Sequence, residues 1–206
     1  ANATVVAGSG SVTTNGLNTT ITQTTQRLAI DWTSLSTRAN ETLVFSQPNA
    51  SAIALNRITG THPSELLGDL TANGQVFILN PNGILFGAGS QINVGGLVAS
   101  TLSMSNADFM AGDHVFGNSG SSGSVINQGS MTATHGGYLA LLAPEVRNEG
   151  VMVASLGTAL LAAGNKVTLN LENGSLLGYS IDQGAINALA ENKHLIKADG
   201  GQVLLS

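Results

Sequence analysis

The sequence predicts an all-β fold built as a parallel β-helix, and two observations predict it: the composition and the internal repeats. Only 9% of the 206 residues are charged and 42% are hydrophobic, while 26 are glycine. Such a chain is too apolar to be disordered, and it is poor in the Glu, Lys and Arg that solubilise long helices. Short segments with alternating apolar residues recur between turns that contain Asn and Gly. A unit of this kind cannot bury its apolar face alone, so repeated units must stack into a solenoid.

A seven-residue pattern, Asn-x-Gly-x-apolar-x-Ala, sets the expected register of the rungs. It occurs at residues 93–99, 127–133 and 148–154, and at 192–198 with histidine in place of glycine. The second and third copies start 21 residues apart (127 to 148), and the third and fourth start 44 apart (148 to 192), close to two periods. The pattern predicts that Asn127 stacks on Asn148, and that the apolar position of each copy faces the core. These apolar positions are Leu97, Met131, Met152 and Ile196.

A second repeat, Gly-Gln-Val followed by two apolar residues, begins at Gly74 and at Gly201. Residues 136–141 resemble it and lie about three periods before the last copy. Each rung is thus expected to contain a turn with Asn or Gly, a short alternating strand and another glycine turn.

The whole chain, residues 1–206, is expected to form a single domain with three kinds of segment. Residues 1–45 carry no repeat, and although residues 19–32 alternate, they have no repeat partner; we expect a β cap, with Trp32 buried in it. Rungs fill residues 46–206, interrupted by an excursion near 100–123 that includes the glycine-rich stretch 117–123. Residues 63–70 are expected to form a helical turn with Ser64 as its N-cap. The chain stops within an apparent strand at 203–206, which predicts a fragment of a much longer protein.

Charge and cysteine content exclude several classes of function. The net charge is −5, and the seven Lys and Arg residues form no run, so nucleic acid is not expected as a partner. No apolar stretch approaches the ~20 residues that span a bilayer, and the first nine residues lack the features of a signal peptide. The chain has no cysteine, so backbone pairing and an apolar core must hold the fold together.

The most informative segment is residues 80–84, which lie between two apolar strands. Pro81 fixes the backbone for the second position of a tight turn, Asn82 tolerates the third, and Gly83 relieves the exit. The sequence of the segment is Asn80-Pro81-Asn82-Gly83-Ile84. It is identical to the NPNGI signature of the N-terminal secretion domain of filamentous-haemagglutinin-like exoproteins, the exported partners of bacterial two-partner secretion (TPS). Residues 29–32, 51–60, 72–77 and 95–101 also resemble this family. An NPNL box that occurs in some members is absent, and residues 47–50 are the nearest segment.

The resemblance implies both a fold and a function. Members of the family are right-handed parallel β-helices, and the periplasmic POTRA repeats of an outer-membrane β-barrel transporter recognise them. It implies the secretion domain of a large adhesin, haemagglutinin or haemolysin-like exoprotein that nucleates β-helix folding at the cell surface. The protein would belong to a Gram-negative bacterium and would pass through the periplasm to be secreted or located at the cell surface. We expect a monomer without cofactor, with binding to host or matrix carbohydrate or protein assigned to a downstream region. Residues 80–84 are the expected recognition motif, and a turn needed only for folding is the alternative.

A carbohydrate-binding or polysaccharide-cleaving β-helix protein is the alternative function. Asp108 and Asp113 near His114 form the densest polar group, and Glu145, Arg147 and Glu149 lie on a later strand. Cleavage needs clustered carboxylates, whereas the twelve acidic residues are scattered, so we expect these groups to be solvated and neither a catalytic nor a metal site to exist. The other histidines (His62, His135 and His194) stand alone. Trp32 and Tyr138 could stack on sugars, but we expect Trp32 in the core and Tyr138 at a surface corner.

Overall fold

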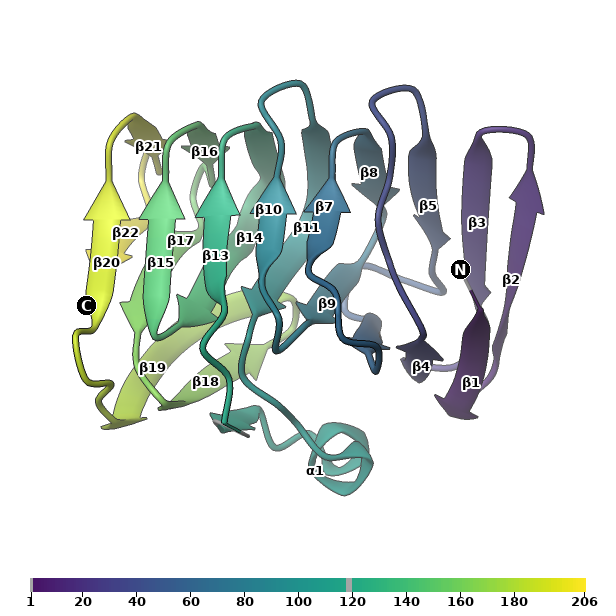
Figure 1. The fold of residues 1–206 in the computed structure, drawn as a ribbon, viewed down its shortest axis with the longest axis horizontal. Helices are drawn as coiled ribbons and strands as arrows, with labels where there is room; N and C mark the ends of the chain where they lie inside the picture. The colour runs from purple at the N-terminus through teal and green to yellow at the C-terminus, as the bar shows by residue number, and fades with distance from the viewer. Residues whose placement is uncertain (1, 118–119) are drawn as a thin grey trace.

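The computed structural model describes residues 2–117 and 120–206, which coil into a right-handed parallel β-helix with three faces (Figure 1). The first face is a column of parallel strands that spans the molecule: β4 (Arg27–Trp32), β6 (Ile53–Ile58), β9 (Gln75–Leu79), β11 (Gln91–Ser100), β14 (Ser130–Ala143), β17 (Thr158–Ala163) and β22 (Gln202–Leu205). All-β architecture and stacked parallel strands agree with the fold class that the sequence predicts.

Two further columns complete the coil. The second consists of β3 (Asn18–Gln23), β5 (Thr42–Ser46), β8 (Asp69–Ala72), the first halves of β11 and β14, β16 (Val151–Val153) and β21 (Leu195–Lys197). The third consists of β7 (Ser64–Leu66), β10 (Ile84–Phe86), β13 (Ser124–Asn127), β15 (Glu145–Asn148) and β20 (Leu189–Asn192). Because side chains alternate along each strand, every rung sends aliphatic residues into one continuous interior core.

The expected register is confirmed for the later rungs. Asn127 pairs with Asn148 and Met131 with Met152, and both methionines are fully buried. The fourth copy continues both columns, since Asn148 pairs with Asn192. The prediction that 44 residues make two rungs is wrong. The third and fourth copies lie on adjacent rungs, and the extra length forms the hairpin of β18 (Lys166–Glu172) and β19 (Ser175–Gln183). For the same reason, residues 136–141 lie two rungs before β22 and not three.

For the first copy of the pattern, residues 93–99, the predicted register is wrong. Asn93 pairs with Thr132, and the residue that stacks under Asn127 is Phe86. Ile92 occupies the place in the methionine column that was expected for Leu97. Leu97 is nevertheless buried, because it belongs to the first face. Because side chains alternate with a period of two along a strand, a copy of the pattern that is shifted along the strand still shows alternating apolar residues. The pattern alone therefore does not determine to which column of strands a copy belongs.

The N-terminal segment contains both antiparallel and parallel strands. β1 (Ala3–Ala7) runs antiparallel to β4, and β2 (Gly10–Asn15) forms a hairpin with β3. Residues 19–32 have no repeat partner in the sequence, yet their strands join the stack: β3 lies parallel to β5, and β4 lies parallel to β6. Trp32 is buried as predicted, and its indole N–H donates to the Asn56 side chain at 3.0 Å.

The helical turn expected at residues 63–70 is wrong, because this segment forms β7 and the start of β8. Ser64 and Leu66 face inward and Glu65 faces solvent, which is the alternation of a strand. Within the described residues, α1 (Asn106–Ala111) is the helix. Ser105 caps its N-terminus by accepting a hydrogen bond from the Asp108 amide at 3.0 Å. Gly112, with φ of 88°, ends it.

The excursion between β11 and β13 carries α1 and β12 (Val115–Gly117) and adds no rung, because β11 pairs directly with β14. Asn118 and Ser119, part of the predicted glycine-rich stretch, lie outside the described residues. β12 pairs with β18 of the second excursion, so two segments distant in sequence form one three-stranded sheet. Together with α1, this sheet covers the first face and buries a second apolar core there, below the coil in Figure 1. No helix among the described residues is long and apolar enough to cross a membrane.

Candidate recognition site

The predicted motif forms a tight turn at a corner of the coil, between β9 and β10. The Gly83 amide donates to the Asn80 carbonyl at 3.1 Å, which closes a four-residue turn with Pro81 and Asn82 at its centre. The order Asn, Pro, Asn, Gly suits a type I turn, whose second position favours proline and whose last position favours glycine. Gly83 has φ of 118°, a conformation that a residue with a Cβ adopts only with strain. Ile84 follows as the first residue of β10 and is buried in the interior core.

Asn80 is fully buried, and its side chain joins two rungs. Its amide group donates to the carbonyl of His62 and to the hydroxyl of Ser64, both at 3.0 Å. Its side-chain oxygen accepts from the backbone amide of Asn82 at 3.0 Å and from the side chain of Asn82 at 2.9 Å. All the polar atoms of a buried amide are thereby satisfied, and loss of one partner of a buried group typically costs about 1–3 kcal/mol. In the folded protein Asn80 therefore holds the corner together and is not available to a partner.

Pro81 and Asn82 form the accessible part of the turn. Both are half-buried, and the Asn82 amide also donates to the Gly60 carbonyl of the preceding rung at 2.9 Å. Together with Thr61, Pro63 and residues 120–122, they line a shallow hollow on the surface. The hollow contains no charged side chain. The turn can thus present a proline ring and one amide to a partner, and it supplies no acid, base or nucleophile.

The return of the first excursion lies directly against this turn. The Ser121 hydroxyl donates to the Pro81 carbonyl at 2.8 Å. A Cβ built on Gly123 would lie 2.6 Å from the Gly83 nitrogen, 2.7 Å from the Asn82 carbonyl carbon and 2.8 Å from the Pro81 oxygen. Only glycine fits so close to three backbone atoms. Sequence reasoning did not associate Ser121 and Gly123 with the motif, because they are about 40 residues away along the chain.

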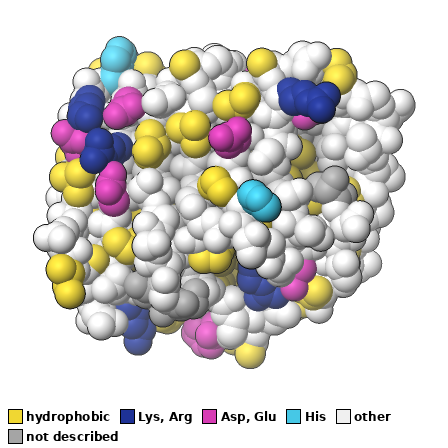
Figure 2. Space-filling model, in the orientation of Figure 1, with side chains coloured by type: hydrophobic (Ala, Val, Ile, Leu, Met, Phe, Trp, Pro, Cys, Tyr) yellow, Lys and Arg dark blue, Asp and Glu magenta, His cyan; other side chains and the backbone are white. Residues whose placement is uncertain are grey.

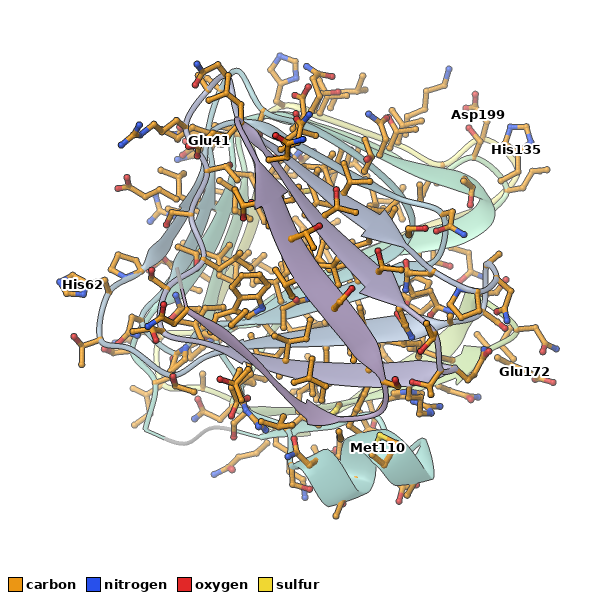
Figure 3. All side chains as sticks on the ribbon, turned by 90° about the vertical axis from the view of Figure 1, so that its right-hand side faces the viewer. Glu41, His62, Met110, His135, Glu172 and Asp199 are labelled. Atoms are coloured by element: carbon orange, nitrogen blue, oxygen red, sulfur yellow. The ribbon has the colours of Figure 1, made fainter. Side chains whose placement is uncertain are left out.

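The residues of the enzyme alternative fall into two groups on different faces of the molecule. Asp108 accepts a hydrogen bond from Ser105 at the start of α1, and with Asp113 and His114 it borders a hollow against β18. Glu145 lies on β15, in the third column, which is a different face of the coil. His62 and His135, labelled in Figure 3, project outward on different sides of the molecule. Within residues 2–117 and 120–206, no group of three or more His, Cys, Asp or Glu residues could hold a metal ion.

His114 is a packed residue of the excursion. It is 6% exposed, and its ring lies 5.8 Å from the ring of Phe77 at a steep angle. Burial, with the charge of Arg27 beside it, lowers the pKa of His114 to about 4, against a raising effect of Asp113. Arg27 donates to the Phe109 carbonyl at 3.0 Å and stacks over the Phe109 ring. These contacts attach the excursion to β4.

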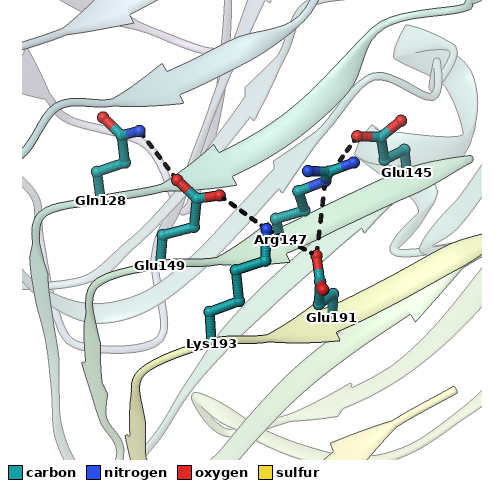
Figure 4. A network of polar contacts seen from close by, with 6 residues as sticks. All are labelled: Gln128, Glu145, Arg147, Glu149, Glu191 and Lys193. Atoms are coloured by element: carbon teal, nitrogen blue, oxygen red, sulfur yellow. Dashed lines mark hydrogen bonds and ion pairs between the residues drawn. The ribbon is translucent and has the colours of Figure 1, made fainter.

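Glu145, Arg147 and Glu149 belong to a charged ladder on the third face, drawn in Figure 4. Arg147 lies between Glu145 at 2.8 Å and Glu191 at 3.8 Å, and Lys193 lies between Glu149 at 3.4 Å and Glu191 at 3.2 Å. The hydrogen bond from Gln128 lowers the pKa of Glu149, and Lys193 adds to that effect. Figure 2 shows charged side chains gathered over the C-terminal strands, on the left of the view. These side chains are partly exposed, which agrees with the solvated charge that the sequence predicts, and the structure adds that they are paired in charge.

The prediction for Tyr138 is wrong. Its side chain is fully buried under the β18–β19 hairpin, and its hydroxyl donates to the Gln75 side chain at 2.5 Å. Burial raises the pKa of the phenol well above its usual value. Neither Tyr138 nor the buried Trp32 is available to stack on a sugar.

Comparison with known proteins assigns the chain to a family. The family model described as TPS secretion domain matches residues 1–206. A heme/hemopexin-binding protein of Haemophilus influenzae strain Rd is 34% identical over 203 residues, 94% of this chain and 22% of the relative. A second heme/hemopexin-binding protein of H. influenzae is 44% identical over 82 residues, 40% of this chain and 9% of the relative.

A solved structure is similar over almost the whole chain. The crystal structure of the HMW1 secretion domain from H. influenzae matches with a TM-score of 0.89 at 32% identity, covering 98% of this chain and 54% of that chain. This chain therefore spans about a fifth of the length of the first relative and about half of the solved HMW1 chain.

Proposed function

Because the chain belongs to the TPS secretion domain family, we propose that it carries a longer exoprotein to an outer-membrane transporter whose periplasmic POTRA repeats recognise residues 80–84. Proteins of this family are exported through the periplasm and across the outer membrane of Gram-negative bacteria to the surface or the medium, and this chain follows that route. The observation that carries the proposal is the family match over residues 1–206, which includes the NPNGI segment.

The burial of the motif supports recognition of a chain that is not fully folded. Asn80 and Ile84 are buried in the finished coil, and only Pro81 and Asn82 reach the surface. A partly unfolded segment would offer its main chain for strand addition, in which backbone pairing gives affinity and a few side chains give selectivity. After export, each new rung can pair with a preformed strand edge, so the first rungs would nucleate β-helix growth at the cell surface.

An export assay tests the proposal with a matched control. In the test variant, alanine replaces both Pro81 and Asn82. In the control variant, alanine replaces Asn173, which lies at the tip of the β18–β19 hairpin with φ of 49°. Both changes weaken a surface turn, so similar losses of folding stability, about 1 kcal/mol, are expected. In cells with the cognate transporter we expect secretion to fall about tenfold for the first variant, which corresponds to ~1.4 kcal/mol of lost recognition. The control should be secreted normally. Equal secretion of both variants would remove residues 81 and 82 from the recognition site.

We also infer that the domain catalyses no reaction, since TPS secretion domains are not an enzyme class. The experiment is to incubate the purified domain with acidic polysaccharides, with and without calcium, and to measure chain cleavage. We expect no cleavage. Activity that disappears in an Asp108→Asn, Asp113→Asn, Glu145→Gln variant would show that the enzyme alternative is correct.

Binding of host or matrix molecules is assigned to other parts of the exoprotein. The first relative is several times longer than this chain, which supports the assignment of export to this domain and of ligand binding to other parts of the exoprotein. We expect the isolated domain not to retain carbohydrate or matrix protein on a binding array, and retention comparable to that of the full exoprotein would contradict the assignment.

A further inference from the structure

The turn at residues 80–83 is enclosed on two sides by segments that arrive at different times along the chain. On one side is the preceding rung, where the Ser64 amide donates to the Gly83 carbonyl at 3.0 Å and Asn82 donates to Gly60. On the other side is the return of the excursion, where Ser121 donates to Pro81 and Gly123 lies against the backbone of residues 81–83. The first side comes before the motif in sequence, and the second comes about 40 residues after it.

Gly123 of the return segment lies directly against the backbone of the turn, so no further strand or loop fits between the two. A Cβ on Gly123 would lie within 3.0 Å of backbone atoms of Pro81, Asn82 and Gly83, which is closer than Cβ atoms approach other atoms in proteins. Directly afterwards, β13 pairs in parallel with β10, with Val125 opposite Ile84. Once residues 121–125 have packed against the turn, they cover its backbone on this side. Before they pack there, this side of the backbone is accessible to a partner.

From these contacts we propose that residues 121–124 mask the recognition motif as the domain folds, so that folding itself ends the interaction with the transporter. The proposal rests on the function proposed above. While the chain is incompletely folded, the main chain of residues 80–83 is open for pairing. When the excursion returns and β13 forms, the same backbone contacts Ser121, Gly123 and Ser124 instead, and the transporter is displaced.

The masking can be weakened without altering the motif. Gly123→Ala places a methyl group where three backbone atoms now lie, and so raises the fraction of molecules with the return segment unseated. Gly89→Ala is the matched control, because a Cβ at Gly89 would meet no atom within 4 Å. Ser121→Ala is a milder second variant, since it removes only the hydrogen bond to Pro81. Circular dichroism establishes folding, and hydrogen exchange of the Gly83 amide reports opening of the turn.

The experiment measures binding of the purified periplasmic region of the cognate transporter in two ways. In the first, the chain is diluted from urea into buffer that contains the transporter fragment. In the second, it is folded completely beforehand. We expect the refolding wild type to be captured and then released as folding completes, and the folded wild type to bind weakly. Folded Gly123→Ala should bind about tenfold more tightly than folded wild type, because apparent affinity scales with the open fraction. Gly89→Ala should behave as wild type.

Each outcome has a distinct meaning. If folded wild type binds as tightly as the refolding chain, the motif is not masked and the inference is wrong. It is also wrong if the Gly83 amide exchanges faster in folded Gly123→Ala without any gain in binding. If Gly123→Ala does not fold, Ser121→Ala decides the matter, with a gain of about threefold expected on the same scale. Failure of the refolding wild type to bind at all would instead overturn recognition of the motif by the transporter, and the masking with it.

Discussion

At the scale of single residues, burial decides which side chains serve the fold. Asn80 belongs to the motif by sequence, yet it is fully buried and hydrogen-bonded to the preceding rung. Tyr138 follows two glycines at a corner, yet it lies under a hairpin. Alternation correctly placed Met131 and Met152 in the interior, since every second residue of a stacked strand faces the core.

Replacement of Met152 by aspartate should unfold the domain. The side chain is 0% exposed and lies between Met131 and Ile196 in a stacked apolar column, so the new carboxylate would be buried without a partner. We expect a loss of more than about 4 kcal/mol, measured by urea denaturation. Thr132→Asp, on the exposed face of the neighbouring rung, is the control and should cost less than about 1 kcal/mol. An unchanged melting temperature for the Met152 variant would show that the inward face is wrongly assigned.

The stability of the domain should depend on pH through His114. Its pKa is about 4 in the folded protein, below the ~6.5 of an unfolded histidine, so the unfolded chain binds the proton first as the pH falls. The contribution of neutral His114 to the free energy of unfolding is therefore fully present above about pH 6.5. It is lost as the pH falls from about 6.5 to about 4, by no more than ~1.4 kcal/mol per pH unit, and the free energy of unfolding then stops changing through this group. Urea denaturation at several pH values measures this slope. We expect His114→Gln to flatten it, and an identical slope in the variant would assign the dependence to other groups.

At the scale of elements, identical residues in register hold neighbouring rungs together. The Asn127 amide donates to the Asn148 side-chain oxygen at 2.8 Å, and the Asn148 amide donates to the Asn192 oxygen at 2.8 Å. Asn127 and Asn148 are fully buried, whereas Asn192 is exposed. This asparagine ladder fixes the corner between the third and second faces, because each amide satisfies its neighbour only when the rungs are in register.

Position within the ladder should determine the cost of losing an asparagine. Asn148→Ala removes the side-chain acceptor of the buried Asn127 amide and the side-chain donor to the buried Gly150 carbonyl, and we expect it to destabilise the domain by about 2–4 kcal/mol. Asn192→Ala at the exposed end of the ladder should cost about 1 kcal/mol or less. The measurement is the urea midpoint of each variant at unchanged slope. Equal costs would show that the ladder contributes through its exposed end and not through burial.

The charged ladder on the same rungs has a different physical character. Arg147 and Lys193 are 32% and 45% exposed in their side chains, and the contact from the Arg147 Nε to Glu145 lacks hydrogen-bond geometry. Pairs of this kind contribute about 0–1 kcal/mol and weaken in salt. The charged ladder therefore keeps the third face solvated, with opposite charges next to each other. The buried asparagines beside it determine the register of the rungs.

At the scale of the whole molecule, the two excursions connect rungs that a simple solenoid would leave independent. Arg27 of β4 and Arg57 of β6 donate to the carbonyls of Phe109 and Met104 in the first excursion. The second excursion donates from Ser175 to the Gly136 carbonyl of β14. Stacked repeats otherwise interact only with their neighbours, so contacts that span several rungs should make unfolding more cooperative.

Phe116→Ala should reveal this connection. Phe116 of β12 is fully buried against Phe77 of β9, with ring centroids 5.8 Å apart, and its truncation should cost about 3–5 kcal/mol. Urea unfolding can be followed both by fluorescence of Trp32, the single tryptophan, and by circular dichroism. We expect the two transitions to coincide in wild type and to separate in the variant. Met110→Ala, at an exposed position on α1 (Figure 3), is the control and should change neither curve. Coincident transitions in the Phe116 variant would mean that the excursions do not couple the rungs.

The sequence by itself determined the fold class, the register of the rungs at residues 127 and 148, the inward methionine column and the motif turn. These features depend on local alternation and on identical residues that stack on one another, and both are visible as periodicity. Only the tertiary structure decided that Phe86 and not Asn93 lies beneath Asn127, that residues 63–70 form strands, and that Tyr138 and Asn80 are buried. It also brought Gly123 against the motif. Such contacts join segments tens of residues apart in excursions that follow no period, and long-range packing of that kind leaves no repeated pattern in the sequence.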